Sequence, residues 1–446
     1  MTLPTVTVVG GGLAGSECAL DLARRGVPVR LIEMRPETTS AAHHTAHLAE
    51  LVCSNSLKAT RRDSAAGLLK EELRRMGCSL LACAEETAVP AGGALAVDRE
   101  AFSAAVEKRI EDEPLIEVVR EEVRDIPNGH VVIAAGPLCS DALAERIREK
   151  LGAESLAFFD AAAPIVDAAS LDRSVLFTQS RYDDQGTGDY LNAPFSRDEY
   201  ERFIDELLAA DRVVQKEFEA RDLFQACQPV EEIARTGRDA LRFGALKPVG
   251  LTDPRTGHRP WAAVQLRAEN AEGTAYNLVG FQTNLTWPEQ KRVFRMIPGL
   301  ENAEFFRYGV MHRNTFVDAP HVLDKTFAIP GTTVRLAGQI CGTEGYVEAM
   351  ASGLLAAANT YADLIGTDPV SLPVTGALGS LVAYATDPAT ENYQPMHVNF
   401  GLVPPLDDGR RRSKRDRYAA YADRALADLD AYLASRGDLF NDGGQD

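Results

Sequence analysis

The sequence predicts an α/β protein in which a Rossmann-type parallel-sheet domain is interrupted by an α+β insertion domain. Three observations support this fold class. The chain begins with a strand, a glycine-rich loop, a helix and a second strand. Another glycine-rich strand, turn and helix occurs far downstream, at residues 334–359. Between them, residues 160–328 carry most of the Gly/Pro turns and polar strand-like stretches. We therefore expect one discontinuous domain, formed by residues 1–159 and 329–446, with residues 160–328 inserted into it.

The first elements form a complete βαβ unit. Residues 5–9 are a β-branched run typical of a strand, and a glycine cluster follows them. Residues 16–25 then have apolar positions at helical spacing, and Gly26 ends that helix. Residues 29–32 form the next strand, which Glu33 closes.

The later elements follow from the same signals. Residues 131–134 are a short apolar run typical of a buried strand, and residues 334–345 combine a strand with a glycine-rich turn. A helix rich in small residues is expected at 346–359. In the insertion, residues 197–221 predict one long charged helix, and another charged helix is expected from 410 to about 434.

The glycine loop of the βαβ unit carries a dinucleotide-binding fingerprint. G-x-G-x-x-G lies between a strand and a helix, and Glu33 follows its last glycine by 18 residues. The first glycine allows the tight turn, the second admits a pyrophosphate, and the third lets helix and strand approach. The helix N-terminus attracts phosphate, and Glu33 would accept hydrogen bonds from ribose hydroxyls. The alternative is a glycine-rich turn that binds nothing. The candidate cofactor-binding residues are Gly10, Gly11, Gly12, Leu13, Ala14, Gly15 and Glu33.

The downstream glycine-rich turn favours FAD over NAD. A second strand, turn and helix that returns to the first domain after a long insertion is typical of FAD-binding oxidoreductases with a glutathione-reductase-like fold. The N-terminus of that helix would stabilise negative charge on a reduced flavin. The insertion holds no second G-x-G-x-x-G, so a nicotinamide reductant would bind only transiently. The candidate residues here are Gly338, Gln339, Gly345 and Tyr346.

Composition excludes several classes of protein. The chain has 446 residues, of which 45% are hydrophobic and 25% charged, as in ordinary soluble proteins. No apolar run reaches the roughly 18 residues of a membrane helix, and no secretory leader is recognisable, so a cytoplasmic location is expected. A net charge of −18 argues against generic nucleic-acid binding. The seven cysteines include no C-x-x-C pair, so we expect neither a metal site nor a redox dithiol.

Two cysteine-bearing segments are candidates for chemistry. Cys53 lies in a run rich in His, Ser, Asn and Lys, just past the strand that Glu33 closes. A flavin-adjacent loop that presents Cys53 is favoured over a structural turn with a core cysteine. His43 and His47, four residues apart, leave a metal site as a third alternative. Cys227 is followed by several cations, which would raise its thiolate fraction, and a buried core cysteine is the alternative.

These motifs together closely resemble the folate- and FAD-dependent tRNA (uracil-5-)-methyltransferases, the TrmFO family, also called Gid. The resemblance covers nearly the whole chain. It rests on VTVVGGGLAGSECA, AHHTAHLAELVCSNSLKA around Cys53, ACQPVEEIARTGRDALRFGALKPVGL around Cys227, and LAGQICGTEGYVEAMASG. Shorter matches are ALAVDREAFS, DYLNAPF, MHRNTF and KRDRYAAYADRALADL.

The resemblance implies an enzyme that converts the T-loop uridine of tRNA to 5-methyluridine. The carbon would come from methylenetetrahydrofolate, and the electrons from reduced FAD, which NADPH or NADH regenerates. Cys227 matches the family cysteine that adds as a thiolate to uracil C6. Cys53 matches the second family cysteine, proposed as a base or partner thiol. Tyr346, Trp287 and His312 are candidates to lie near stacked folate and flavin rings, with core positions as the alternative for Trp287 and Tyr346.

An acidic protein that binds tRNA needs local basic patches. The run at residues 410–417 has six basic residues and one acidic residue, a net charge of +5. A solvated charged face is the alternative. We expect a monomer that binds tRNA with strong salt dependence and no membrane. The candidate contacts are Arg410, Arg411 and Arg412, with Lys58, Arg61, Arg62, Arg74 and Arg75 as a further basic track.

Three rival functions share parts of this pattern. A small-molecule FAD-dependent oxidoreductase explains the Rossmann motifs but not Cys227 or the basic run. The larger flavoproteins that modify the wobble uridine of tRNA carry a long C-terminal region for which 446 residues leave no room. A flavoprotein that binds tRNA without catalysis is the third.

Overall fold

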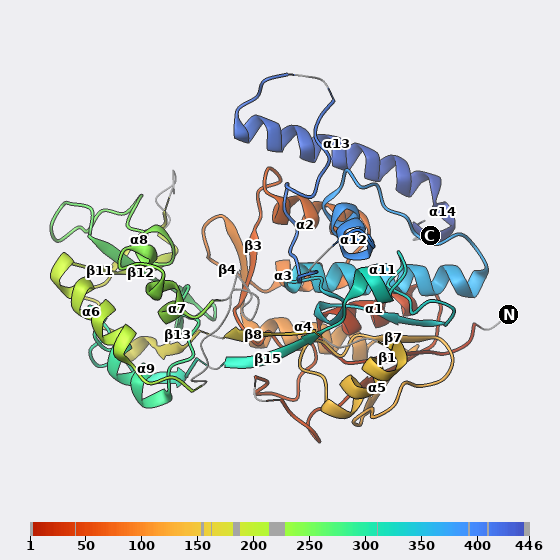
Figure 1. Ribbon diagram of the computed structural model, residues 1–446, viewed down its shortest axis with the longest axis horizontal. Helices are drawn as coiled ribbons and strands as arrows, with labels where there is room; N and C mark the ends of the chain where they lie inside the picture. The colour runs from red at the N-terminus through yellow and green to blue at the C-terminus, as the bar shows by residue number, and fades with distance from the viewer. Residues whose placement is uncertain are drawn as a thin grey trace.

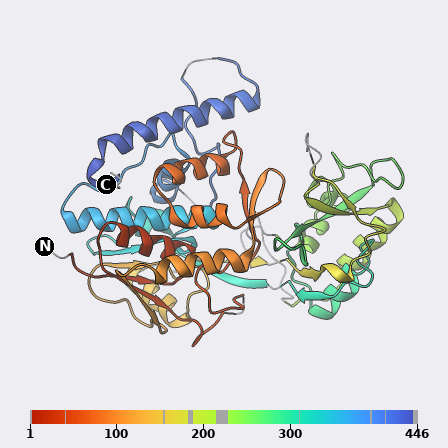
Figure 2. The same cartoon turned by 180° about the vertical axis from the view of Figure 1, so that it is seen from behind.

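The computed structural model describes residues 3–40, 42–152, 156–161, 163–181, 188–213, 228–309, 311–390, 393–407 and 410–440, with only the backbone described at 156–161 and 311–314. The molecule has two parts side by side, and the larger part holds both termini (Figure 1). The view from behind shows the same division (Figure 2). In the described ranges no helix is long and apolar enough to cross a membrane.

The larger part is built on a five-stranded parallel sheet of order β16-β7-β1-β2-β6. The glycine-rich loop after β1 therefore opens at the carboxyl edge of the central strand, where doubly wound sheets bind their ligands. This order confirms the predicted Rossmann-type fold. The strands are β1 (Val6–Val9), β2 (Val29–Glu33), β6 (Ile116–Arg120), β7 (Val131–Ile133) and β16 (Val334–Leu336).

Helices bury both faces of this sheet. Along β7, Val132 packs into the core cluster that contains α1, whereas Val131 and Ile133 pack with α5 on the other face. A small sheet of β3 (Ser56–Ala59), β5 (Ala94–Val97) and β4 (Ala88–Val89) lies toward the smaller part. The helices are α1 (Leu13–Arg24), α2 (Ala65–Arg75), α3 (Ser79–Glu86), α4 (Arg99–Glu111), α5 (Asp141–Leu151), α10 (Ala319–Val322), α11 (Tyr346–Ile365), α12 (Ala377–Thr386), α13 (Lys414–Ser435) and α14 (Gly437–Phe440).

Helices α1 and α11 cross with their backbones in contact. A Cβ atom at Gly353 of α11 would overlap the backbone of Ala14 in α1, so only glycine allows this approach. Each helix also begins at a glycine, Gly12 for α1 and Gly345 for α11. The crossing therefore brings two helix N-termini to the same edge of the sheet.

The smaller part contains a six-stranded antiparallel sheet of order β10-β11-β12-β13-β9-β14. Helices α6 and α9 pack against each other in it, as expected of an α+β insertion. The strands are β9 (Ile165–Asp167), β10 (Phe177–Thr178), β11 (Tyr190–Phe195), β12 (Ala262–Ala268), β13 (Ala275–Leu278) and β14 (Phe305–Arg307). The helices are α6 (Arg197–Ala209), α7 (Val230–Arg235), α8 (Ala240–Phe243) and α9 (Trp287–Phe294).

The predicted charged helix of the insertion ends earlier than expected. α6 starts at Arg197, as the sequence predicts, and Ser196 and Glu199 form a capping box there. The helix ends at Ala209, and Ala210 is already extended. Arg212 forms a β-bridge with Leu285, so pairing with a distant segment stops the helix. The prediction of a helix continuing to residue 221 is wrong over 210–213, and residues 214–221 lie outside the described ranges.

Two paired strands connect the parts. β8 (Leu156–Ala161) and β15 (Met311–Phe316) form a two-stranded antiparallel sheet between them (Figure 1). The core of the smaller part is formed by residues between 163 and 303. Phe316 and Phe327 belong instead to a core cluster of the larger part. We therefore propose that the chain crosses at β8 and β15, and that residues 316–328, which the predicted division places in the insertion, pack with the larger part.

Candidate cofactor cavity and active-site loop

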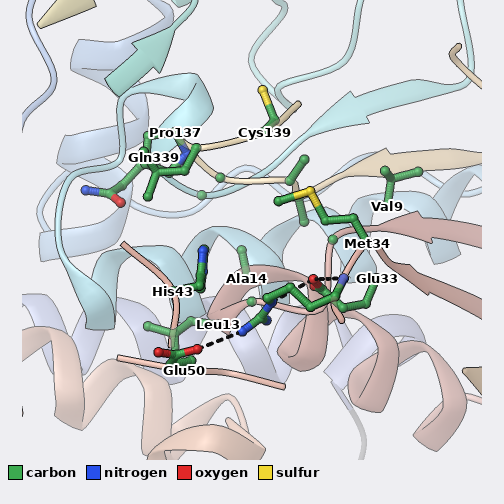
Figure 3. Close-up of a pocket in the computed structure, with 18 of the residues that line it drawn as sticks. Val9, Leu13, Ala14, Glu33, Met34, His43, Glu50, Pro137, Cys139 and Gln339 are labelled. Atoms are coloured by element: carbon green, nitrogen blue, oxygen red, sulfur yellow. Dashed lines mark hydrogen bonds and ion pairs between the residues drawn. The ribbon is translucent and has the colours of Figure 1, made fainter. Parts of the chain in front are cut away.

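A cavity opens at the carboxyl edge of the parallel sheet, where the two glycine-rich turns meet (Figure 3). Its empty volume, open mouth included, is about 980 Å³. The loop after β1, the end of β2, the loop after β7 and the start of α11 form its walls. The predicted cofactor-binding residues that line it are Gly10, Gly12, Leu13, Ala14, Glu33, Gly338, Gln339, Gly345 and Tyr346.

The three glycines of the fingerprint are needed for different reasons, two for the packing of the fold and one for the space beside it. Gly10 has a φ of +102°, and a Cβ there would overlap Ala134. A Cβ at Gly15 would overlap the carbonyl of Gly10. Both glycines are therefore needed by the fold itself. Gly12 has an ordinary φ of −78°, and a Cβ there meets nothing within 4 Å. Only a ligand that fills the cavity beside Gly12 would require glycine at that position.

The two helix N-termini make the cavity suited to an anionic ligand. The N-cap residues, Gly12 of α1 and Gly345 of α11, are glycines and so have no side chain to cap the first turn. Their free N–H groups and the helix dipoles favour negative charge, such as a pyrophosphate or a reduced flavin ring. The unfilled space at Gly12 and these two N-termini together fit a flavin dinucleotide.

Glu33, at the end of β2, is a buried carboxylate held by a neighbouring cation. Arg35 Nε donates to Glu33 Oε1 at 2.8 Å, and the Gly11 N–H donates to Oε2 at 2.8 Å. Burial by itself raises the pKa of Glu33, but the hydrogen bonds and charge of Arg35 outweigh it and bring the pKa below its usual value. Oε1 also accepts from the Arg35 N–H at 3.1 Å, so Oε2, which accepts only from Gly11 among the described residues, keeps the further lone pair that a ribose hydroxyl needs.

Arg35 joins Glu33 to a second carboxylate. Arg35 is 1% exposed, and its Nη1 donates to Glu50 Oε2 at 3.0 Å. Glu50 also accepts from the N–H groups of His44 and Thr45, which fixes the loop there. Figure 3 marks the ion pairs that reach Glu33 and Glu50 with dashed lines. Sequence reasoning missed both Arg35 and Glu50, although a basic residue two positions after Glu33 was an available signal.

The loop after β7 forms a further wall that sequence reasoning missed. Pro137, Cys139 and Ser140 line the cavity there. Burial raises the pKa of the Cys139 thiol to about 11, so it is neutral at pH 7. The available signal was topological, because the loops that follow parallel strands meet at one edge of the sheet.

Cys53 is tied to the start of α11. The hydroxyl of Tyr346 accepts hydrogen bonds from the N–H groups of Cys53, at 2.8 Å, and Ser54, at 3.0 Å. Burial raises the pKa of Tyr346, so it remains a neutral phenol. Because Tyr346 also lines the cavity, this contact holds the half-buried Cys53 at a fixed position relative to it.

Trp287 and the three arginines at 410–412, predicted as substrate contacts, are not among the residues that line the cavity. Trp287, the first residue of α9, is 56% exposed, and its ring stacks on Tyr308 with centroids 5.5 Å apart. Arg410, Arg411 and Arg412 precede α13, which packs along α2 at the top of Figure 1. Cys227 lies outside the described ranges, and His312 is described only by its backbone.

The histidines that suggested a metal site take separate partners. His43 Nδ1 lies 2.7 Å from Ser40 Oγ, and His47 pairs with Glu107. Burial and the charge of Arg35 lower the pKa of His43 to about 4. Over the residues that the structure describes, no group of three or more His, Cys, Asp or Glu side chains is arranged to hold a metal ion.

The predicted basic track near Cys53 is neutralised by ion pairs. Each of its five cations lies next to a carboxylate, so these residues form no continuous positive surface. The pairs are Lys58–Glu348, Arg61–Asp63, Arg62–Asp423, Arg74–Glu85 and Arg75–Asp430.

Comparison with known proteins gives matches along nearly the whole chain. The family described as Glucose inhibited division protein A matches residues 5–368. A Geobacter sulfurreducens protein named methylenetetrahydrofolate–tRNA-(uracil-5-)-methyltransferase TrmFO is 58% identical over 96% of this chain and 99% of its own. A protein of the same name from Desulforudis audaxviator is 54% identical over 97% of this chain and 99% of its own. The solved structure of Aquifex aeolicus GidA, at 18% identity, covers 98% of this chain and 77% of that one with a TM-score of 0.68, which shows a shared fold.

Replacing Gly12 tests whether glycine is required there for FAD binding or for the stability of the fold. Gly12→Ala should leave the unfolding temperature of the FAD-free protein unchanged, because the new methyl group meets no protein atom. It should weaken FAD binding by about 1–3 kcal/mol, as expected when a methyl group enters a filled site. Titration with FAD, followed by flavin fluorescence, measures this. Gly93→Ala, which also meets nothing within 4 Å, is the control. Wild-type affinity in Gly12→Ala would contradict the assignment.

Replacing Arg35 tests the buried carboxylates. Arg35→Met should destabilise the protein by about 3–5 kcal/mol at pH 7, because two buried carboxylates lose their cation. Arg35 lowers the pKa of Glu33, so this stabilisation is present at neutral pH and is lost as the pH falls through that pKa. In urea unfolding, the difference in unfolding free energy between wild type and Arg35→Met should therefore be full at pH 7 and should shrink as the pH falls below 4.5, the usual pKa of a glutamate.

The control residue, Arg30, lies on β2, the strand that ends two residues before Arg35. Arg30 pairs with Glu121 at 3.3 Å on the surface, so Arg30→Met should change stability by only about 0–1 kcal/mol. If the difference in unfolding free energy between wild type and Arg35→Met does not change with pH, the loss of stability comes from lost packing and not from lost charge.

Proposed function

This chain belongs to the Glucose inhibited division protein A family and, within it, to the TrmFO enzymes, and we propose that it methylates C5 of the T-loop uridine of tRNA. The relatives are named methylenetetrahydrofolate–tRNA-(uracil-5-)-methyltransferase, and we infer the same reaction for this chain. The observation that carries the proposal is identity of 58% over 96% of the chain. The carbon comes from methylenetetrahydrofolate, and the product is 5-methyluridine.

FAD is the resident cofactor in this proposal, and the cavity supports it. Gly12 leaves room for a pyrophosphate at the N-terminus of α1, and Glu33 offers its carboxylate to ribose hydroxyls. Gly345 and Tyr346 place the N-terminus of α11 at the same cavity. When bound, FAD supplies the electrons that reduce the transferred carbon to a methyl group, and NADPH or NADH restores them.

The two cysteines divide the work on the uracil ring. C5 of uracil is a poor nucleophile until a thiolate adds to C6, and Cys227 makes that addition. C5 then forms a bond to the folate-derived carbon. Cys53 removes the C5 proton, and the electron pair left behind expels the nitrogen that carried the new carbon, which leaves a methylene group double-bonded to C5. Reduced FAD, when bound, would supply the hydride that turns this methylene into a methyl group, and the electron pair released at C5 then expels the Cys227 sulfur from C6. Both thiols are thus regenerated once the proton on Cys53 has been released.

The described residues on either side of the segment that bears Cys227 are bound to one stretch of the insertion, residues 282–284. The Val213 N–H donates to the Asn284 carbonyl at 2.8 Å, and the Val230 N–H donates to the Gln282 carbonyl at 2.7 Å. The buried carboxylate of Glu231 accepts from the Asn284 N–H at 2.6 Å. Val213 and Val230, which lie on either side of this segment, are therefore both bound to residues 282–284.

An activity assay tests the proposal. Purified protein with unmodified tRNA transcript, methylenetetrahydrofolate, FAD and NADPH should produce 5-methyluridine, measured by mass spectrometry of the digested nucleosides. Cys227→Ala and Cys53→Ala should each lose this activity while they keep bound FAD. Cys83→Ala, a core cysteine of α3, should retain it. A transcript with cytidine at the target position is the substrate control.

Two outcomes would contradict the assignments. Absence of 5-methyluridine with the wild-type protein, under NADPH and under NADH, would reject the methyltransferase function. Methylation by Cys227→Ala at the wild-type rate would reject that residue as the nucleophile.

Trp287 is proposed as a contact for a flat ring of the substrate. It heads an aromatic stack with Tyr308, and Tyr308 stacks on Phe305 with centroids 5.1 Å apart. Because Trp287 is exposed and lies outside the cavity lining, a nucleobase of the tRNA is the favoured partner over the folate. Arg410, Arg411 and Arg412 are proposed to contact tRNA phosphates, away from the cavity.

Fluorescence of Trp287 distinguishes these partners. The chain has two tryptophans, so Trp261→Phe leaves Trp287 as the sole indole. Its emission should be quenched by tRNA and unchanged by methylenetetrahydrofolate. Trp287→Ala should weaken tRNA binding by about 1–3 kcal/mol, the usual contribution of one stacked base. Quenching by the folate alone would assign Trp287 to the folate instead.

A further inference from the structure

The loop around Cys53 is held by side chains from distant parts of the chain. We call residues 51–55 the Cys53 loop. The carbonyl of Val52 accepts from Arg307 Nη2 at 2.7 Å, and the carbonyls of Leu51 and Cys53 accept from Arg99. Main-chain carbonyls in a loop are usually bound by water or backbone, so guanidinium donors to three successive carbonyls are an unusual restraint.

The other side of the same loop is fixed as firmly. Arg267 Nε donates to Asn55 Oδ1 at 2.7 Å, and its Nη2 donates to Ser54 Oγ at 3.1 Å. The amide of Asn55 donates in turn to the carbonyls of Val97 and Ala268, both at 3.0 Å. With Tyr346 bound to two of its N–H groups, every residue of the Cys53 loop is held by at least one side chain from elsewhere.

Two of the three arginines come from one face of the insertion sheet. Arg267 on β12 lies opposite Asn277 on β13, and Asn277 lies opposite Ile165 on β9. Ile165 is in turn paired with Arg307 on β14. Directly opposed residues project to the same face, so this row presents both guanidinium groups toward the Cys53 loop. Three strand spacings separate them by about 14 Å, so they hold the loop at two points.

Burying these two cations is unfavourable in itself. Arg267 is 6% exposed, and burial lowers the pKa of both Arg267 and Arg307. The charge of Glu269 offsets part of this cost for Arg267, whereas Arg307 Nε is buried without a hydrogen-bond partner among the described residues. Apolar residues would satisfy packing at a smaller desolvation cost. What the arginines provide is a rigid link between the sheet and the Cys53 loop.

The same part of the molecule carries the flanks of the Cys227 segment. Val213 and Val230 fasten those flanks to residues 282–284, which follow β13 in the chain. The arginine row and these anchors therefore belong to one structural unit. Its hydrophobic core is formed by residues drawn from the range between Ala163 and Ala303.

We propose that Arg267 and Arg307 are positioning residues that fix Cys53 to the insertion sheet, in the same part of the protein that binds Val213 and Val230 on either side of the Cys227 segment. The inference rests on the proposed function, in which the two sulfur atoms act on neighbouring ring atoms, C6 and C5. A displacement of about 1 Å in such an arrangement can lower the rate by about 100-fold. Arg99 and Tyr346 tie the same loop to the larger part, beside the cofactor cavity.

Substitution of each arginine tests this. Arg307→Met and Arg267→Met keep the length of the side chain but remove the donors. In the FAD-loaded protein without tRNA or folate, the rate of Cys53 alkylation by iodoacetamide, read by mass spectrometry of its peptide, should rise about tenfold, because the loop loses one or two hydrogen bonds. The kcat for methylation should fall by about 100-fold while KM for tRNA stays unchanged. Arg307→Lys and Arg267→Lys, which keep a donor, should fall between these variants and wild type.

The matched control is an arginine with the same type of contact elsewhere in the insertion. Arg295 Nε and Nη2 donate to the Ala303 carbonyl at 3.0 and 2.8 Å, away from the Cys53 loop. Arg295→Met should therefore leave Cys53 alkylation and kcat at their wild-type values. Unfolding temperature and the flavin absorption spectrum, recorded for every variant, verify that each is folded and loaded. If a Met variant fails these checks, its Lys variant decides.

Several results would overturn the proposal. Wild-type alkylation of Cys53 in the Met variants would do so, whether or not kcat falls, and so would equal effects in Arg295→Met. Because alkylation of Cys53 is measured without tRNA or folate, its result does not depend on whether the protein is a methyltransferase. A wild-type protein without methyltransferase activity, whose Arg variants still expose Cys53, would reject the function and leave the positioning role intact.

Discussion

The backbone contact between α1 and α11, where Gly353 meets Ala14, sets the geometry on which the site depends. With no side chain between them, the helices begin at one edge of the sheet, at Gly12 and Gly345, and both N-termini reach the same cavity. Two helix dipoles then favour negative charge on a bound ligand. Glu33 completes this wall, and the hydrogen bonds and charge of Arg35, with the Gly11 N–H, outweigh the effect of burial on its pKa.

From that cavity a continuous set of contacts leads to the second part of the molecule. Tyr346 begins α11, lines the cavity and accepts hydrogen bonds from the Cys53 loop. Arg267 and Arg307 hold the same loop on the insertion sheet. The loop that carries Cys53 thus connects the cavity to the insertion, as the proposed reaction of a flavin and two thiols requires.

The net charge of −18 does not indicate which surface of this protein is available to bind RNA. The basic residues that follow Cys53 are paired with carboxylates, Lys58 with Glu348 and Arg62 with Asp423 among them. Arg267 and Arg307 are buried on backbone and side-chain oxygens of the Cys53 loop. The run before α13 lies apart from the cavity, on the far side of α2 in Figure 1. Charge is distributed by tertiary pairing, which a count along the chain does not reveal.

The sequence by itself determined the Rossmann-type fold, the two glycine-rich turns and the fingerprint that ends at Glu33, because glycine spacing and strand and helix periods are local properties. It did not predict Arg35 with Glu50, the wall at Cys139, or the arginine row at Arg267 and Arg307. It extended the insertion helix past Ala209, where a bridge to Leu285 ends it. Each of these features depends on which distant segments lie side by side. Strand order and register decide that, and they are fixed only when the whole chain packs.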